Sequence, residues 1–200
     1  MTTITVNCCS CSPPPAAPAV LRPEDVYGLS CATVLPEHVN GAAALDQQMV
    51  CGKAVLPAGK AITHLGVLLS SPGRGSQSGE ARLAVYSHTG GLIAATANDN
   101  KLFITYGWAY SPLEAPVSAE PEDRMIWLTA LVPAYSTAQP GFIMVENPIY
   151  GEPDIYNPRG RRMFTHPGLT LLPDDVGGDY PTMKVLVPIV GVDLRENSST

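Results

Sequence analysis

Residues 61–70, with the sequence AITHLGVLLS, indicate most clearly how this chain folds. The run is apolar, contains β-branched residues and ends at the turn-forming segment that starts with Ser71 and Pro72. Successive side chains of a β-strand point to opposite faces, so Ile62 and Thr63 should begin two separate faces. The even-numbered residues are therefore expected on one face of a strand and the odd-numbered residues on the other.

Similar short runs follow along the chain, separated by glycine- and proline-containing turns. The run 124–132 is nearly all apolar, which is typical of a central strand covered on both faces. Glycines at 90 and 91 favour a tight turn after residue 87, whereas Pro188 favours an edge position or a bulge. Strands are expected at 48–55, 61–70, 81–87, 92–97, 101–106, 124–132, 141–146 and 183–192.

About eight short strands with glycine- and proline-rich connections predict an all-β fold, an antiparallel β-sandwich of jelly-roll type. The composition agrees, since the 200 residues include 20 prolines and 18 glycines, which argue against long helices. Hydrophobic residues make up 45% of the chain and charged residues only 15%, against about 25% in an average domain. A surface with so little charge suits a protein that packs against neighbours, and a sparsely charged monomer is the alternative.

The first 40 residues differ from the remainder. Pro13, Pro14, Pro15 and Pro18 favour an extended polyproline conformation without internal hydrogen bonds. We therefore predict an extended N-terminal arm over residues 1–40 and a β-sandwich domain over 41–200. The arm holds few large apolar residues, so we expect it to become ordered only on a partner.

The five cysteines lie within the first 51 residues of the chain, and their odd number favours reduced thiols. A metal site formed with His38, or a disulfide or intersubunit crosslink, are the alternatives. The closely spaced cysteines do not show the two separated pairs of a structural zinc site, so no metal is predicted. The cysteines are Cys8, Cys9, Cys11, Cys31 and Cys51.

Charge and hydropathy argue against nucleic-acid and membrane partners. The net charge is −6, and the basic cluster Arg159, Arg161 and Arg162 is read as a solvated or ion-paired loop rather than a phosphate site. No secretion signal is seen at the N-terminus, and no apolar run approaches the length of about 20 residues that a spanning helix needs. We expect a soluble chain with no membrane insertion.

No motif nominates a catalytic centre. Residues 75–79, GSQSG, place glutamine where a nucleophile elbow needs serine. Asp174, Asp175 and Asp179 lack the spacing of a known calcium loop, and paired carboxylates for glycoside hydrolysis are not nominated by any pattern. The four histidines at 38, 64, 88 and 166 lack metal-site spacing, with His64 expected to be structural. We therefore predict a non-enzymatic protein without cofactor.

Three aromatic residues form the one constellation that suggests a binding surface. Tyr106, Trp108 and Tyr110 alternate at a spacing of two, so they share a face if the strand beginning near residue 101 continues. Such a row can stack on sugar rings, contact another subunit or simply pack within the fold. It is our candidate glycan or interface platform.

Four segments, taken together, resemble a known family. They are 56–67 (LPAGKAITHLGV), 81–96 (ARLAVYSHTGGLIAAT), 126–131 (IWLTAL) and 168–173 (GLTLLP). Their order resembles the β-sandwich modules in minor tail proteins and related virion proteins of actinobacteriophages. The resemblance spans about residues 45–192 and concerns architectural residues, so it implies no catalytic residue. The Cys- and Pro-rich arm and the short length depart from the family.

The resemblance implies a structural virion protein of a tailed bacteriophage, either tail-associated or decorating the capsid, assembled in the host cytoplasm. Its partners would be other virion proteins and copies of itself; a trimer is expected by analogy, because cyclic oligomers are common in such assemblies. The alternative is a carbohydrate-binding module that recognises host cell-envelope glycans.

Overall fold

The computed structural model describes residues 28–33, 41–146, 163–176 and 185–194. Within these ranges there is no helix, and all strand pairings are antiparallel, which confirms the predicted all-β sandwich. Several predicted features lie outside the described residues. These are the arm prolines 13, 14, 15 and 18, Cys8, Cys9, Cys11, His38, the cluster Arg159, Arg161 and Arg162, and Asp179.

One layer is a five-stranded sheet built around the apolar run that the sequence marks as central. β9 spans Arg124–Val132 and lies between β3 (Gln48–Leu56) and β6 (Arg82–Ser87), so its predicted central position is confirmed. β12 (Met163–Pro167) pairs with β3 at one edge, and β7 (Leu92–Ala95) pairs with β6 at the other.

The second layer is a seven-stranded sheet centred on β4, Ile62–Ser71. β8 (Gly107–Val117) pairs along one side of β4. β14 (Ile189–Val192) and β11 (Gly141–Glu146) share its other side. The outer strands are β1 (Cys31–Ala32) on β14, and β2 (Gly41–Ala44) and β13 (Val185–Leu186) on β11. A separate ribbon pairs β5 (Gln77–Ser78) with β10 (Ala134–Tyr135).

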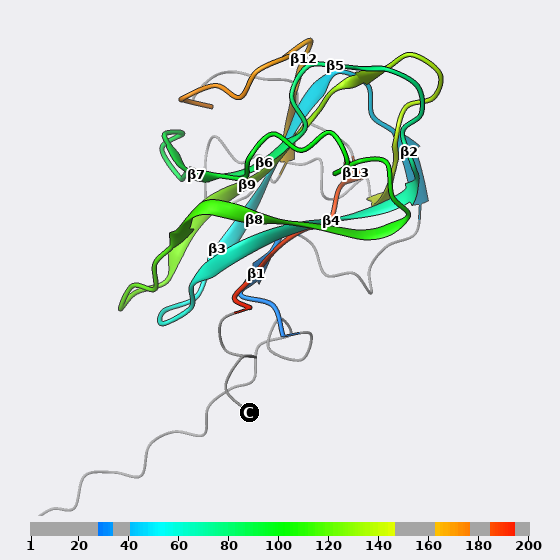
Figure 1. Ribbon diagram of the computed structural model, residues 1–200. Coiled ribbons are helices and arrows are strands. Elements are labelled where there is room, and N and C mark those ends of the chain that lie inside the picture. Colours follow the sequence, from blue (N-terminus) through cyan, green and yellow to red (C-terminus); the bar gives the residue numbers. More distant parts are fainter. Residues whose placement is uncertain (1–27, 34–40, 147–162, 177–184, 195–200) are drawn as a thin grey trace, which may run out of the picture.

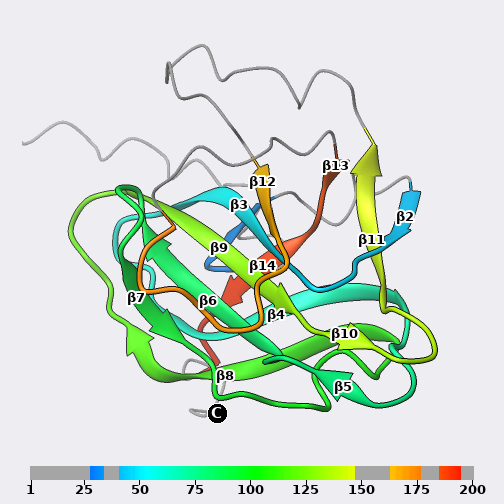
Figure 2. The ribbon, with the colours of Figure 1, turned by 90° about the horizontal axis from the view of Figure 1, so that it is seen from above.

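The chain crosses between the two sheets at most of its connections, as in a jelly roll (Figures 1 and 2). β3 leads into β4 of the opposite sheet, and β8 leads back into β9. The β6–β7 hairpin stays within one sheet, on the turn that Gly90 makes at a positive φ of 112°. These crossings bring sequence-distant strands side by side, so the core depends on contacts across the whole chain.

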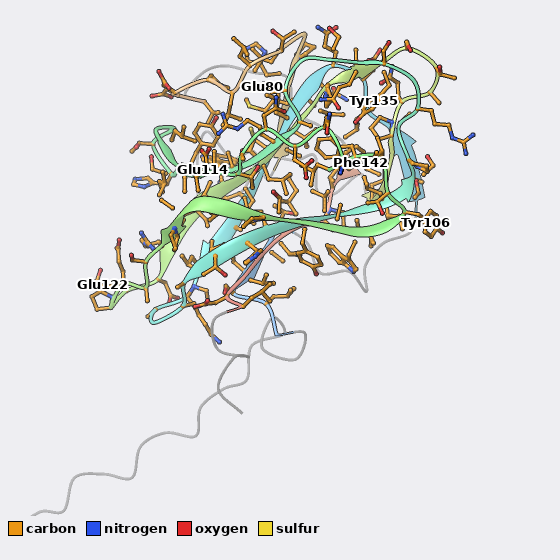
Figure 3. The ribbon with its side chains drawn as sticks, in the orientation of Figure 1. Glu80, Tyr106, Glu114, Glu122, Tyr135 and Phe142 are labelled. Atoms are coloured by element: carbon orange, nitrogen blue, oxygen red, sulfur yellow. The ribbon has the colours of Figure 1, made fainter. Side chains whose placement is uncertain are left out.

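The main core lies between the sheets and is formed by one face of each. Leu83, Val85 and Leu128 from the five-stranded sheet meet Leu65 and Val67 from β4, all without exposed surface. Phe142 of β11 points into this interior (Figure 3) and packs against Phe103, with ring centroids 5.6 Å apart. At about 25 cal/mol per Å² of apolar surface, this burial is the main source of stability.

A second apolar cluster covers the outer face of the five-stranded sheet. Met49, Tyr86 and Leu131 are fully buried there beneath the segment that follows β12, which contributes Leu172 and Val176. The Tyr86 hydroxyl donates a 2.7 Å hydrogen bond to the main-chain oxygen of Pro173 in that segment. The alternation of Leu83 and Val85 with Arg82, Ala84 and Tyr86 predicts a half-buried strand at 81–87. This prediction is wrong in one respect, because both faces of β6 are buried.

The faces of β4 predicted from sequence are wrong at Ile62. The pairing register with β8 shifts between Ile62 and His64, so the regular alternation does not extend to this end of the strand. Ile62 is buried in the main core with Leu65 and Val67, rather than on the outer face with His64.

The strand predicted at 101–106 is also wrong, because these residues form turns. The Asp99 side chain accepts a hydrogen bond from the Lys101 amide, and Leu102 N–H donates to Asp99 O. This local bonding curls the chain, and Phe103 is thereby buried between the sheets.

Part of the predicted arm belongs to the sandwich. β1 pairs with β14 through Cys31 and Gly191, and Ser30 N–H donates to Gly191 O at 2.8 Å. The single strand predicted at 183–192 is divided into β13 and β14, and Pro188, which favours an edge position or a bulge, lies in the interruption between them. The root of the N-terminal segment is thus fixed at one edge of the seven-stranded sheet.

Candidate binding surface

The aromatic residues nominated from sequence lie at the start of β8. Gly107 opens this strand at a φ of 83°, a conformation that glycine adopts without strain. Alternation then turns Ala109 toward the core and Trp108 and Tyr110 toward the outer face. Their rings stack, with centroids 5.7 Å apart and planes inclined by 23°. The predicted shared face of these two residues is confirmed.

Tyr106 is separate from this pair. It lies in the turn before β8, is 75% exposed, and sits at the tip where β8 and β4 meet (Figure 3). The alternating row of three rings predicted from sequence is therefore a stacked pair on the sheet, with a third ring at its end. We call Trp108 and Tyr110 the ring pair.

Gly66 makes room for the ring pair. It is the cross-strand partner of Tyr110, and a Cβ at this position would overlap the Tyr110 ring. The ring therefore lies against the bare backbone of β4, an arrangement in which an aromatic residue shields a glycine of the neighbouring strand. Glycine inside an otherwise apolar strand is the sequence signal that could have revealed this close approach.

Trp108 packs against apolar residues that come from near both ends of the chain. It packs on the cluster of Leu29, Val190 and Val192, together with Ala32. Sequence reasoning missed Leu29, since a single leucine next to a two-residue strand gives no periodic pattern. The N-terminal segment therefore enters the domain beside the ring pair.

The ring pair combines a buried base with an exposed upper surface. Tyr110 is 45% exposed. The partial burial of its ring raises the pKa of its hydroxyl above the ordinary value. The side chains at the outward pairing positions of β4 and β8 around it are His64, Leu68 and Pro112. None of these three residues is an acid, lysine or arginine.

A depression of about 440 Å³ lies at the end of the five-stranded sheet where the β6–β7 hairpin meets the start of β9. Its charged side chains are engaged in holding loops: Asp123 accepts a hydrogen bond from Ala58 N–H, and Arg124 binds Glu120 and the main-chain oxygen of Ser118. We assign these groups to loop structure. The depression is lined by Ser87, His88, Ile93, Asp123, Arg124, Met125 and Ile126.

The remaining sequence candidates are placed as follows. In the GSQSG segment, Gln77 and Ser78 form β5, and Gln77 accepts a hydrogen bond from the Tyr135 hydroxyl. Asp174 and Asp175 lie beside the β7 hairpin, where Asp174 O accepts from Leu92 N–H. Among the described residues, no group of three or more histidine, cysteine or acidic side chains is arranged to hold a metal.

Two of the cysteines fall within the described ranges, and both are buried thiols. Cys51 lies in the second apolar cluster, where the Thr129 hydroxyl donates to its sulfur at 3.3 Å. Burial raises the pKa of this thiol to about 12, an effect that the hydrogen bond from Thr129 partly offsets. Cys51 is therefore a packed core residue rather than a reactive nucleophile.

Comparison with known proteins finds no match, either among protein-family models or among curated proteins. In the part of the chain that the structure describes, no helix has the length and apolar character to cross a membrane.

Proposed function

We propose that this chain is a non-enzymatic structural protein of a tailed bacteriophage virion, associated with the tail or decorating the capsid. It docks onto neighbouring subunits through its N-terminal arm and its weakly charged faces. Its partners are other virion proteins and further copies of itself, with a trimer expected by analogy.

The observation that carries this proposal is the fixed root of the arm. Residues 28–33 are tied into the seven-stranded sheet through β1, and Leu29 packs into the same cluster as Trp108. The 27 residues before this anchor include the proline-rich run, which favours an extended form and lacks the apolar content for a core of its own. A rigid domain with an anchored extended segment suits a subunit that reaches onto its neighbours.

The resemblance to actinobacteriophage modules adds a second line of support. Three of its segments, far apart in sequence, pack together: β6 pairs with β9, and Tyr86 of β6 bonds to Pro173 of the last segment. The segments that carry the resemblance thus lie in contact with one another in the fold.

The proposal is tested on phage particles. We expect the chain to co-purify with particles through a density gradient when these are taken from cells that express its gene, at a fixed copy number per particle by quantitative mass spectrometry. The capsid protein of the same particles serves as the internal standard. Recovery of the chain only in the soluble fraction, at every stage of particle production, would contradict a virion role.

A carbohydrate-binding module is the second candidate function, favoured by the stacked and partly exposed ring pair. Aromatic rings offer apolar faces together with polar edges, a combination that suits sugar rings. Binding of host cell-envelope glycan that disappears on substitution of Tyr106, Trp108 and Tyr110 by alanine would favour this candidate.

A further inference from the structure

We propose that the ring pair of Trp108 and Tyr110 is the docking site for the chain's own proline-rich segment, residues 13–18. This inference rests on the proposed assembly role and names the contact by which the arm would act. It joins two features that the sequence leaves separate, and three observations support it.

The first observation is chemical fit. Proline-rich segments in the polyproline conformation dock on aromatic-lined surfaces, and their stiffness lowers the entropy lost on binding. Pro15 and Pro18 have the P-x-x-P spacing, which puts both rings on one edge of a polyproline helix that has three residues per turn. Trp108 and Tyr110 offer two neighbouring aromatic rings on one sheet face.

The second observation is charge. Residues 11–21 of the chain carry no charged side chain, and none of the outward neighbours of the ring pair on β4 and β8 is an acid, lysine or arginine. A basic or acidic peptide would meet no opposite charge at these positions of β4 and β8. The neutral Pro- and Ala-rich segment would lose no charge–water contacts on binding.

The third observation is position. The described chain starts at Gly28, and Leu29 already lies in the cluster beneath Trp108. Ten residues separate Pro18 from Leu29, enough to span up to about 33 Å when extended. The proline-rich segment is therefore tethered near the ring pair at an effective concentration of order millimolar, and it can reach the ring pair of its own or of an adjacent copy.

The test follows the fluorescence of Trp108 in full-length protein. Trp127→Phe leaves Trp108 as the only tryptophan, since the chain has two. In this background we compare the native arm with an arm in which Pro14, Pro15 and Pro18 are replaced by serine. We expect acrylamide to quench Trp108 more strongly when the prolines are absent. Unchanged quenching would overturn the proposal, and this comparison leaves every sheet residue near the ring pair intact.

A peptide titration then measures the contact directly. A synthetic peptide of residues 12–21 is added to the serine-arm chain, and we expect a saturable change in Trp108 emission. Tyr110→Ala should weaken binding about tenfold, because an aromatic contact in a binding site contributes on the order of 1 kcal/mol or more. Leu171→Ala is the matched control, since Leu171 is 64% exposed in the segment that covers the other sheet, and should leave binding unchanged. Thermal unfolding of each variant verifies that it is folded.

The outcomes separate this inference from the proposed function. Absence of peptide binding in a protein whose oligomer still depends on the arm overturns the ring-pair contact alone. Peptide binding by a chain that is always monomeric supports the ring-pair contact within one chain and contradicts the assembly role. Equal binding by the Tyr110→Ala chain and its parent also overturns the ring-pair contact.

Discussion

Replacing Phe142 with alanine is expected to lower the free energy of unfolding by about 3–5 kcal/mol, in the range measured for buried phenylalanines in other proteins. Phe142 has no exposed surface and contacts Phe103, so truncation removes apolar burial and leaves a cavity between the two sheets. This loss is a large fraction of the 5–15 kcal/mol typical of a whole domain. Urea unfolding followed by circular dichroism measures the change.

Ile104→Ala is the control for this prediction. Ile104 directly follows Phe103 in the same turn but is 47% exposed, so its truncation should change stability by no more than about 0.5 kcal/mol. A similar loss in both variants would show that the two phenylalanines do not form the core contact described here.

Stability is expected to fall steeply above pH 9. The pKa of Cys51 is raised from 9.0 to about 12 by burial, so above pH 9 the unfolded thiol ionises while the folded thiol stays protonated. The contribution of the protonated thiol is thus complete below pH 9 and is lost as the pH rises to 12. One such group costs on the order of 1 kcal/mol per pH unit within this interval.

Buried tyrosines act in the same direction at slightly higher pH. Burial raises the pKa of Tyr86, and burial together with the nearby Asp99 carboxylate raises that of Tyr135 to about 12. Urea unfolding at pH 8, 9, 10 and 11 gives the slope of stability against pH. Cys51→Ala should flatten this slope above pH 9 and Tyr86→Phe above pH 10; identical slopes in all three proteins would contradict the described burial.

The strands that the sequence predicts well have patterns formed over many residues. The predicted bounds 124–132 and 141–146 coincide with β9 and β11, because each run is mostly apolar and is bounded by turn residues. Spacing also placed Trp108 and Tyr110 on one face. In these cases local preference and tertiary packing favour the same structure.

The errors arise where distant contacts override local pattern. The register between β4 and β8 shifts beside Ile62, and Phe103, in the turn at 101–106, is buried against Phe142. The short strand β1 is formed by pairing with β14, some 160 residues away in sequence. A local sequence pattern does not identify such distant partners. The place where the arm joins the sandwich is therefore seen only in the structure.

The central claim, that this chain assembles through its arm, is tested most directly by the molar mass of the purified protein in solution. Light scattering would compare the full chain with one in which Pro13, Pro14, Pro15 and Pro18 are serine, and with one that begins at residue 28 and so retains β1. We predict a stable oligomer, a trimer by analogy, for the full chain and a fall toward monomer for both variants. A full chain that is monomeric at all concentrations, or an oligomer unaffected by either change, would contradict the claim.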